Sequence, residues 1–195
     1  MQEEFGFDRE KFKDAVHFVI HHVGDNGGRN SLGTTKLHKA LYYSDILRFL
    51  DTGQPLTGED YLRQRFGPTA RHLAWAIQEL EKERRISVSR VNYFGFAKSE
   101  YAADAAFRSN RLASDEIALI THVIEFVCQH TAHEISEFSH DEVWSSVAMG
   151  ERIPYYAAFA MLPAELTEDD IEDAANEAIR LAPRIEAAKR DRHIV

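Results

Sequence analysis

The histidines are the residues whose number and spacing could support chemistry. The chain contains 10 of them. His17 and His21 stand four residues apart, the spacing at which side chains share a helix face, and His130, His133 and His140 follow in one later segment. Such imidazoles can bind zinc, and one beside a carboxylate can act as a general base. The zinc-protease sequence His-Glu-x-x-His does not occur, so we expect solvated or hydrogen-bonded imidazoles and no bound metal.

Nucleophiles and phosphate-binding loops are not indicated either. No serine stands in the sequence Gly-x-Ser-x-Gly, and the glycines near residue 27 lack the Lys-Ser/Thr ending of a phosphate loop. The single cysteine, Cys128, follows an apolar run, which is typical of a buried thiol. The acidic runs 3–4 and 168–170 fit helix starts or solvated surface. We therefore predict that the chain is not an enzyme and uses no cofactor, with a His-dependent hydrolase or phage-related enzyme as the alternative.

Composition limits the partners. Of the 195 residues, 44% are hydrophobic and 28% charged, and the formal net charge is -9. This balance disfavours a sequence-independent nucleic-acid contact and an anionic membrane surface, and we expect no direct DNA binding despite the arginines near residues 84–90. The charge either aids solubility or suits a basic protein partner. The acidic N-terminus does not resemble a signal peptide, and no apolar run reaches the roughly 20 residues of a membrane span, so we expect a cytoplasmic protein.

The spacing of apolar residues predicts a mainly α-helical fold, a single compact domain over residues 1–195 with one small β-hairpin. We expect a leading helix within 1–30 that Asp8 can cap, and a central helix from Thr34 or Thr35 to a left-handed stop at Gly53. Residues 131–134 have the capping-box pattern of a helix start. The next predicted elements are a helix that opens at 66–69 and a hairpin of 86–89 with 94–101. Two further helices are predicted to begin at 114 and 131, and the second breaks near 139 and resumes to 150. Helical turns over 155–161 and a C-terminal helix within 167–195 complete the prediction.

Several segments carry the motifs of a known family. Residues 36–45 read Lys-Leu-His-Lys-Ala-Leu-Tyr-Tyr-Ser-Asp, and residues 66–68 read Phe-Gly-Pro. The other matching segments are 53–61, 139–144 and 150–155. In this order they resemble the Panacea domain, the SocA-like antitoxin family, across residues 36–155. Ala40 stands where the family often has leucine.

The resemblance implies a mainly helical fold with a small β element, and the function of an antitoxin. It implies direct neutralisation of a cognate protein toxin that is encoded by an adjacent gene, often in a prophage. An alternative within the same family is an adaptor that delivers the toxin to the ClpXP protease. About 30 residues precede the first motif, too few for the extra DNA-binding module that some members carry.

The toxin-binding residues are expected among large or basic side chains in and near these motifs. We expect Tyr42 and Trp144 to lie in the core. The binding face could also lie on the first helix, the hairpin or the C-terminal helix. The residues that we predict to bind the toxin are Lys39, Tyr43, Phe66, Arg71, Tyr93, Phe94 and Tyr155.

Overall fold

The structure of the chain is a computed structural model. It describes residues 5–25, 32–93, 95–109 and 111–162 and, further on, residues 172, 176, 177, 179, 180 and 182. For residues 93, 96 and 97 it describes the backbone alone. The chain divides into two compact units, Met1–Met161 and Leu162–Val195. The described residues from 172 to 182 are helical, and the rest of the helix predicted within 167–195 lies outside the described residues. Among the helices described, none is both long and apolar enough to span a membrane.

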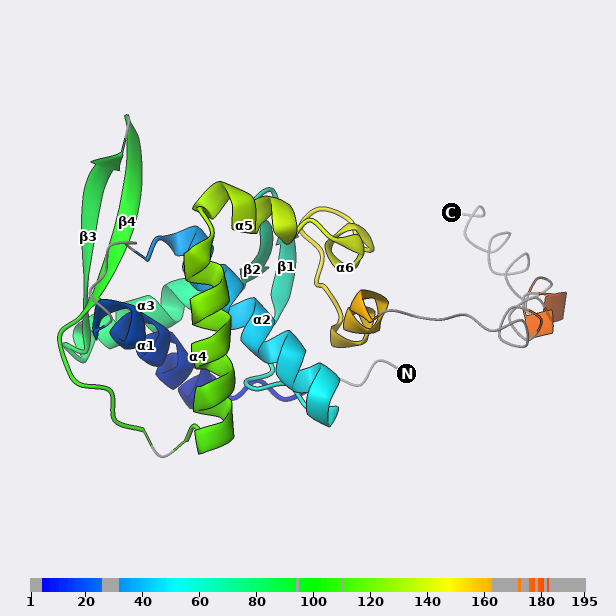
Figure 1. Cartoon of the computed structure of the whole chain (residues 1–195), viewed down its shortest axis with the longest axis horizontal. Coiled ribbons are helices and arrows are strands. Elements are labelled where there is room, and N and C mark those ends of the chain that lie inside the picture. The colour runs from blue at the N-terminus through cyan, green and yellow to red at the C-terminus, as the bar shows by residue number, and fades with distance from the viewer. Residues whose placement is uncertain are drawn as a thin grey trace, which may run out of the picture. The chain divides into compact units, whose positions relative to one another are not determined.

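The first unit is mainly helical and carries two short antiparallel hairpins (Figure 1). Its elements are α1 (Arg9–Asp25), α2 (Thr34–Thr52), β1 (Tyr61–Gln64), β2 (Gly67–Ala70), α3 (Leu73–Lys82), β3 (Ile86–Tyr93), β4 (Phe96–Ala103), α4 (Ser114–Gln129), α5 (Ala132–Phe138), α6 (Glu142–Ser145) and the 3-10 helix η1 (Tyr155–Met161).

Helix α2 is the central element, as its apolar residues on more than one face predict. It contacts α1, α4, α5, η1 and strand β2, and Leu37, Tyr42 and Ile46 on it are at most 1% exposed. Gly53 ends the helix at a φ of 73°, the predicted left-handed stop. The predicted threonine cap is wrong, because Gly33 precedes the first turn and no side chain caps it.

Local signals also predict the first, fourth and fifth helices correctly. The backbone N–H of Lys11 donates to Asp8 Oδ1 at 2.9 Å at the start of α1. At α5, the N–H of Glu134 donates to Thr131 Oγ1 at 3.2 Å, and the N–H of Thr131 donates to Glu134 Oε2 at 2.7 Å. These reciprocal bonds form a capping box, which needs no tertiary contact to direct the chain into a helix.

The β1–β2 hairpin corrects the prediction that a helix opens at residues 66–69. Arg63 pairs with Pro68 and Gln64 with Gly67, so these residues form a tight turn between antiparallel strands. Gly67 has a φ of 87°, outside the helical region, and α3 begins only at Leu73. The unit therefore has two hairpins where the sequence predicts one. The predicted hairpin is confirmed as β3 and β4, which extend from the helical body in Figure 1.

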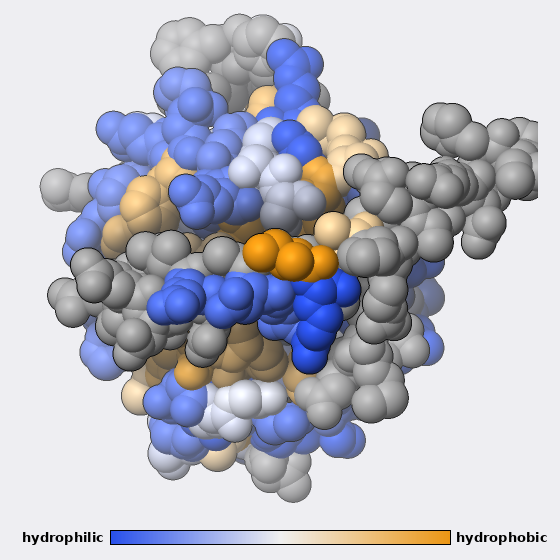
Figure 2. All heavy atoms as spheres, turned by 90° about the vertical axis from the view of Figure 1, so that its right-hand side faces the viewer, coloured by the Kyte–Doolittle hydropathy of each residue, from blue (hydrophilic) through white to orange (hydrophobic). Residues whose placement is uncertain are grey.

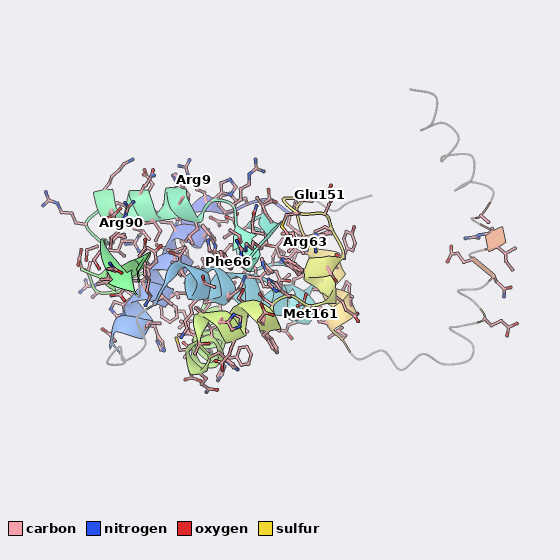
Figure 3. All side chains as sticks on the ribbon, turned by 90° about the horizontal axis from the view of Figure 1, so that it is seen from above. Arg9, Arg63, Phe66, Arg90, Glu151 and Met161 are labelled. Atoms are coloured by element: carbon pink, nitrogen blue, oxygen red, sulfur yellow. The ribbon has the colours of Figure 1, made fainter. Side chains whose placement is uncertain are left out.

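The segment after α6 returns to strand β1. Helix α6 ends at Ser145, so the prediction that this helix continues to Gly150 is wrong. The N–H of Gly150 donates to the Arg63 carbonyl and the N–H of Arg63 donates to the Glu151 carbonyl, each at 2.8 Å. Arg63 and Glu151 accordingly lie close together in Figure 3. These long-range bonds satisfy backbone groups that a longer helix would have paired locally.

Asp45 joins α2 to the chain that leads into β1. Its buried carboxylate accepts hydrogen bonds from the Thr57 N–H at 2.6 Å, the Thr57 hydroxyl at 2.7 Å, the Tyr61 hydroxyl at 2.7 Å and the Gly58 N–H at 3.3 Å. Burial raises the pKa of the Asp45 carboxyl, and the hydrogen bonds from Thr57 and Tyr61 act in the opposite direction. One acceptor thus orders Thr57 and Gly58, which lie in a segment without regular structure, and Tyr61, the first residue of β1.

We expect Asp45→Asn to lower the free energy of unfolding by roughly 2–4 kcal/mol, because an amide presents only one acceptor and turns N–H groups toward the remaining donors. Denaturation in urea measures the change. The control is Asp51→Asn, at an exposed position on the same helix, which should change stability by less than about 0.5 kcal/mol. Equal effects of the two substitutions would contradict this role for Asp45.

Candidate functional site

Residues from three distant segments meet beneath the β1–β2 turn. Lys39 on α2 donates from Nζ to the Pro68 carbonyl at 2.9 Å. A Cβ added at Gly67 would lie 2.2 Å from Ser139 Oγ and 2.5 Å from Lys39 Nζ, so a side chain at this point of the turn would have to displace both groups. Ser139, between α5 and α6, donates its hydroxyl to the Ser136 carbonyl at 2.7 Å. The turn that carries Arg65 and Phe66 therefore rests on α2 and on the chain after α5.

Lys39 is an ionisable group in an unusual environment. It is 1% exposed, and burial lowers the pKa of its ammonium to about 7, with Asp141 acting in the opposite sense. Burial also raises the pKa of the Asp141 carboxyl, which accepts a hydrogen bond from the Trp144 N–H at 2.8 Å. Lys39 is thus close to the balance between its charged and neutral forms at neutral pH.

A second buried acid, Glu59, pairs with His72. Glu59 is 0% exposed and accepts hydrogen bonds from the His72 N–H at 3.2 Å, while its Oε1 lies 3.0 Å from His72 Nδ1. Burial raises the pKa of Glu59 to about 7, and His72 acts against that increase. Phe7 stacks on the His72 ring at 4.5 Å between centroids. Among the hydrogen bonds of the described residues, none joins His72 to a serine or cysteine side chain.

Of the histidines singled out by spacing, His133 and His140 line one pocket, and His17, His21 and His130 are not among its lining residues. His17 and His21 share a face of α1 with ring centroids 6.2 Å apart, and His17 Nδ1 lies 2.8 Å from an Arg85 nitrogen. His130 Nδ1 lies 2.8 Å from the Phe126 carbonyl. Within the described ranges, no three His, Cys, Asp or Glu side chains are grouped so that they could hold a metal ion.

Three of the residues predicted to bind the toxin are buried. Lys39, Tyr43 and Tyr155 are 1–4% exposed, and the hydroxyl of Tyr155 donates to the Glu59 carbonyl at 2.8 Å. Phe66 is 62% exposed, and exposed Arg71 forms an ion pair with Asp60 at 3.4 Å. The Tyr93 side chain and Phe94 lie outside the described residues. Of the predicted set, only Phe66 and Arg71 are therefore seen at the surface, and a contact of any of them with a toxin stays a prediction.

Tyr42 is a core residue as predicted, with 0% exposure, whereas Trp144 is half-buried. The Trp144 ring lies under the Arg63 guanidinium at 4.0 Å, and its indole N–H donates to the Gln64 carbonyl at 3.1 Å. The His140 ring packs on it at 4.2 Å between centroids. Trp144 therefore fastens α6 to strand β1.

A pocket opens next to Phe66, between the β1–β2 turn and α5. Its volume is about 420 Å³. Phe66, His133, Ser136 and His140 are among the side chains that line it. The sequence singles out His133 and His140 only as possible metal-binding or catalytic groups. Nothing local indicates that they would meet Phe66, which lies 67 or more residues earlier in the chain.

Phe138 is a second exposed aromatic residue near this region, and the sequence analysis missed it. It lies at the end of α5 and is 56% exposed. Its ring contacts Phe126 of α4 and Tyr43 of α2, at centroid distances of 5.3 and 6.1 Å. Other exposed apolar residues, Met149, Tyr156 and Phe159, follow in and before η1. In the space-filling view of one face, apolar patches alternate with hydrophilic side chains (Figure 2).

Comparison with known proteins gives one match. Residues 37–145 match the family model described as "Antitoxin SocA-like, Panacea domain". No curated protein and no solved structure matches the chain. The matched range includes Lys39, Asp45, Gly67 and Ser139, so it covers the buried contacts that support the β1–β2 turn.

We expect Gly67→Ala to destabilise the protein strongly, since its Cβ would overlap Ser139 and Lys39 in addition to the strain of a positive φ. Gly150→Ala is the matched control, because Gly150 has a φ of 85° and no atom within 4 Å of an added Cβ. Chemical denaturation should show a loss for Gly67→Ala that exceeds the control by roughly 1–3 kcal/mol. Equal losses would mean that the packing around Gly67 can yield at little cost.

Lys39 predicts a pH dependence of stability. Its pKa is about 7 in the folded chain, whereas in the unfolded chain we expect the ordinary lysine pKa of 10.5. Between these values the unfolded chain binds the extra proton, so the free energy of unfolding should rise with pH from about 7 to about 10.5 relative to Lys39→Met. Urea denaturation of both proteins across this range tests the difference. Lys82→Met, at an exposed lysine, should follow the wild type, and parallel pH profiles of the wild type and Lys39→Met would refute the assignment.

Proposed function

The chain belongs to the SocA-like antitoxin family with a Panacea domain, and from this premise we propose that it neutralises a cognate protein toxin by binding it directly. The match over residues 37–145 is the observation that carries the proposal, since it spans more than half of the chain. The toxin would be the product of an adjacent gene. Family membership favours a binding protein over an enzyme.

The face that we propose for toxin binding includes Phe66 and Phe138. Both rings are more than half exposed, and aromatic side chains are enriched among the residues that dominate protein–protein binding energy. Phe66 stands on a turn held by Lys39 and Gly67, and Phe138 rests on Tyr43 and Phe126. Rings fixed in this way lose little conformational entropy on binding. Two of the buried residues in the predicted set, Lys39 and Tyr43, would thus act by supporting the face from beneath.

The charge of the chain supports association with a basic toxin. A net charge of -9 produces a negative field that accelerates encounter with a positively charged protein. The same field keeps the free antitoxin from binding acidic proteins. Both effects weaken as salt is added, because the Debye length falls to about 8 Å at physiological ionic strength.

Co-expression with the adjacent gene tests the proposal. We expect wild-type chain to restore growth of cells that express the neighbouring toxin and to co-purify with it. A Phe66→Ala/Phe138→Ala double variant should weaken the complex by roughly 30-fold or more, the equivalent of one or two aromatic hot spots.

The control for this experiment is Phe159→Ala, which removes an equally exposed ring from η1. Thermal denaturation of each variant separates loss of binding from loss of folding. Failure of the wild-type chain both to restore growth and to form a complex would refute the proposed function. Retained binding by the double variant would show that the toxin binds a face without Phe66 and Phe138.

A further inference from the structure

The pocket between the β1–β2 turn and α5 has a mixed wall in which one phenyl ring and two imidazole rings stand among polar and small side chains. Phe66 lies on the turn, His133 on α5 and His140 just after α5, and all three line the pocket. Phe66 is 62% exposed and His133 is exposed, so these two rings are open to a partner. A volume of about 420 Å³ is within the range of sites that accept one large side chain together with neighbouring groups.

The chain around this pocket is strongly acidic on the helical side. Residues 112–151, which form α4, α5 and α6, contain no lysine and no arginine. The acidic residues of this segment are Asp115, Glu116, Glu125, Glu134, Glu137, Asp141, Glu142 and Glu151. Asp115 and Glu116 form ion pairs with Arg48 and Lys11, but these contacts lie at the start of α4.

One carboxylate lines the pocket, and two more are exposed on α5 and α6. Glu137 lines the pocket, its side chain is 62% exposed, and its only ion pair among the described residues is with His140 at 3.5 Å. Glu142 is exposed and forms no ion pair within the described part of the chain. Glu134 is exposed, and its hydrogen bonds with Thr131 lower its pKa, so it is ionised at neutral pH.

Arg65 gives the opposite rim a positive charge. It lines the pocket from the turn, and its guanidinium lies 5.5 Å from the Phe66 ring centroid. A partner that filled the pocket would therefore meet a cation on the side of the β1–β2 turn and carboxylates on the side of α5 and α6. This separation of charge orients a bound segment, since a cationic residue is favoured only on the helical side.

Resting on the proposed function, we infer that this pocket receives a basic segment of the toxin, with an aromatic or large apolar side chain that packs against Phe66 and with lysine or arginine residues beside Glu137 and Glu142. The rings of Phe66, His133 and His140 favour an aromatic or large apolar side chain in the pocket. The charge of α5 and α6 selects its neighbours, because a cation next to several carboxylates is attracted and an acidic segment is repelled.

A defined peptide tests this inference without the toxin. The probe is acetyl-KKFKK-amide, and its acidic counterpart acetyl-EEFEE-amide has the same ring with opposite charge. In NMR titrations of the full chain, the basic peptide should shift the backbone signals of residues 65–66 and 132–137, and the acidic peptide should not. Added salt should weaken the binding.

Charge-reversal variants provide the matched control. Glu137→Lys/Glu142→Lys should weaken binding of the basic peptide by roughly tenfold, whereas Asp51→Lys/Glu81→Lys, which changes the net charge equally at exposed positions on α2 and α3, should change it by less than about twofold. Phe66→Ala should also weaken it, and thermal denaturation confirms that each variant is folded.

The outcomes separate this inference from the proposed function. Equal weakening by both charge-reversal pairs, equal binding of both peptides, or shifts only outside the pocket would overturn the inference. In those cases a complex of the wild-type chain with the adjacent gene product would leave the antitoxin function intact. Peptide binding in the pocket together with no toxin complex would instead support the chemistry of the pocket and refute the function.

Discussion

The β1–β2 turn depends on hydrogen bonds with buried polar side chains of α2. Lys39 reaches the Pro68 carbonyl and Asp45 accepts hydrogen bonds from Thr57, Gly58 and Tyr61. A buried charge costs several kcal/mol unless its surroundings satisfy it, so α2 can bury these residues only when the segment 57–68 is in place. The contacts consequently specify one position of the turn more strongly than apolar packing alone would.

This constraint connects the family motifs to the surface. Most motif residues, among them Lys39, Asp45 and Gly67, are buried and make no direct contact with solvent. They hold Phe66 outward and bring the chain after α5 close to it, through Ser139. Motif residues can thus be required for binding without touching a partner.

The buried acid Glu59 connects separate segments of the fold. Glu59 has a pKa near 7 and lies beside His72, a combination that enzymes use for proton transfer. Here the Glu59 carboxylate also accepts the backbone N–H of His72, and the Glu59 carbonyl accepts the hydroxyl of Tyr155. Glu59 therefore connects the chain before β1 to the start of α3 and to η1. Structural networks perturb pKa values in the same way as active sites.

The sequence by itself determined the elements that local interactions specify. Asp8, the Thr131–Glu134 capping box and Gly53 act within a few residues, so the starts of α1 and α5 and the end of α2 follow from them. The pattern of 86–89 together with 94–101 likewise determined the β3–β4 hairpin, and the order of the motifs determined the family.

The tertiary structure alone decided the β1–β2 hairpin, the return of 150–153 to β1 and the exposure of each motif residue. Lys39 and Tyr43 lie inside while Phe66 and Phe138 lie outside, although their residue types suggest no such division. These features arise from hydrogen bonds and packing between residues far apart in the chain, and a local pattern contains no information about which distant groups will satisfy one another.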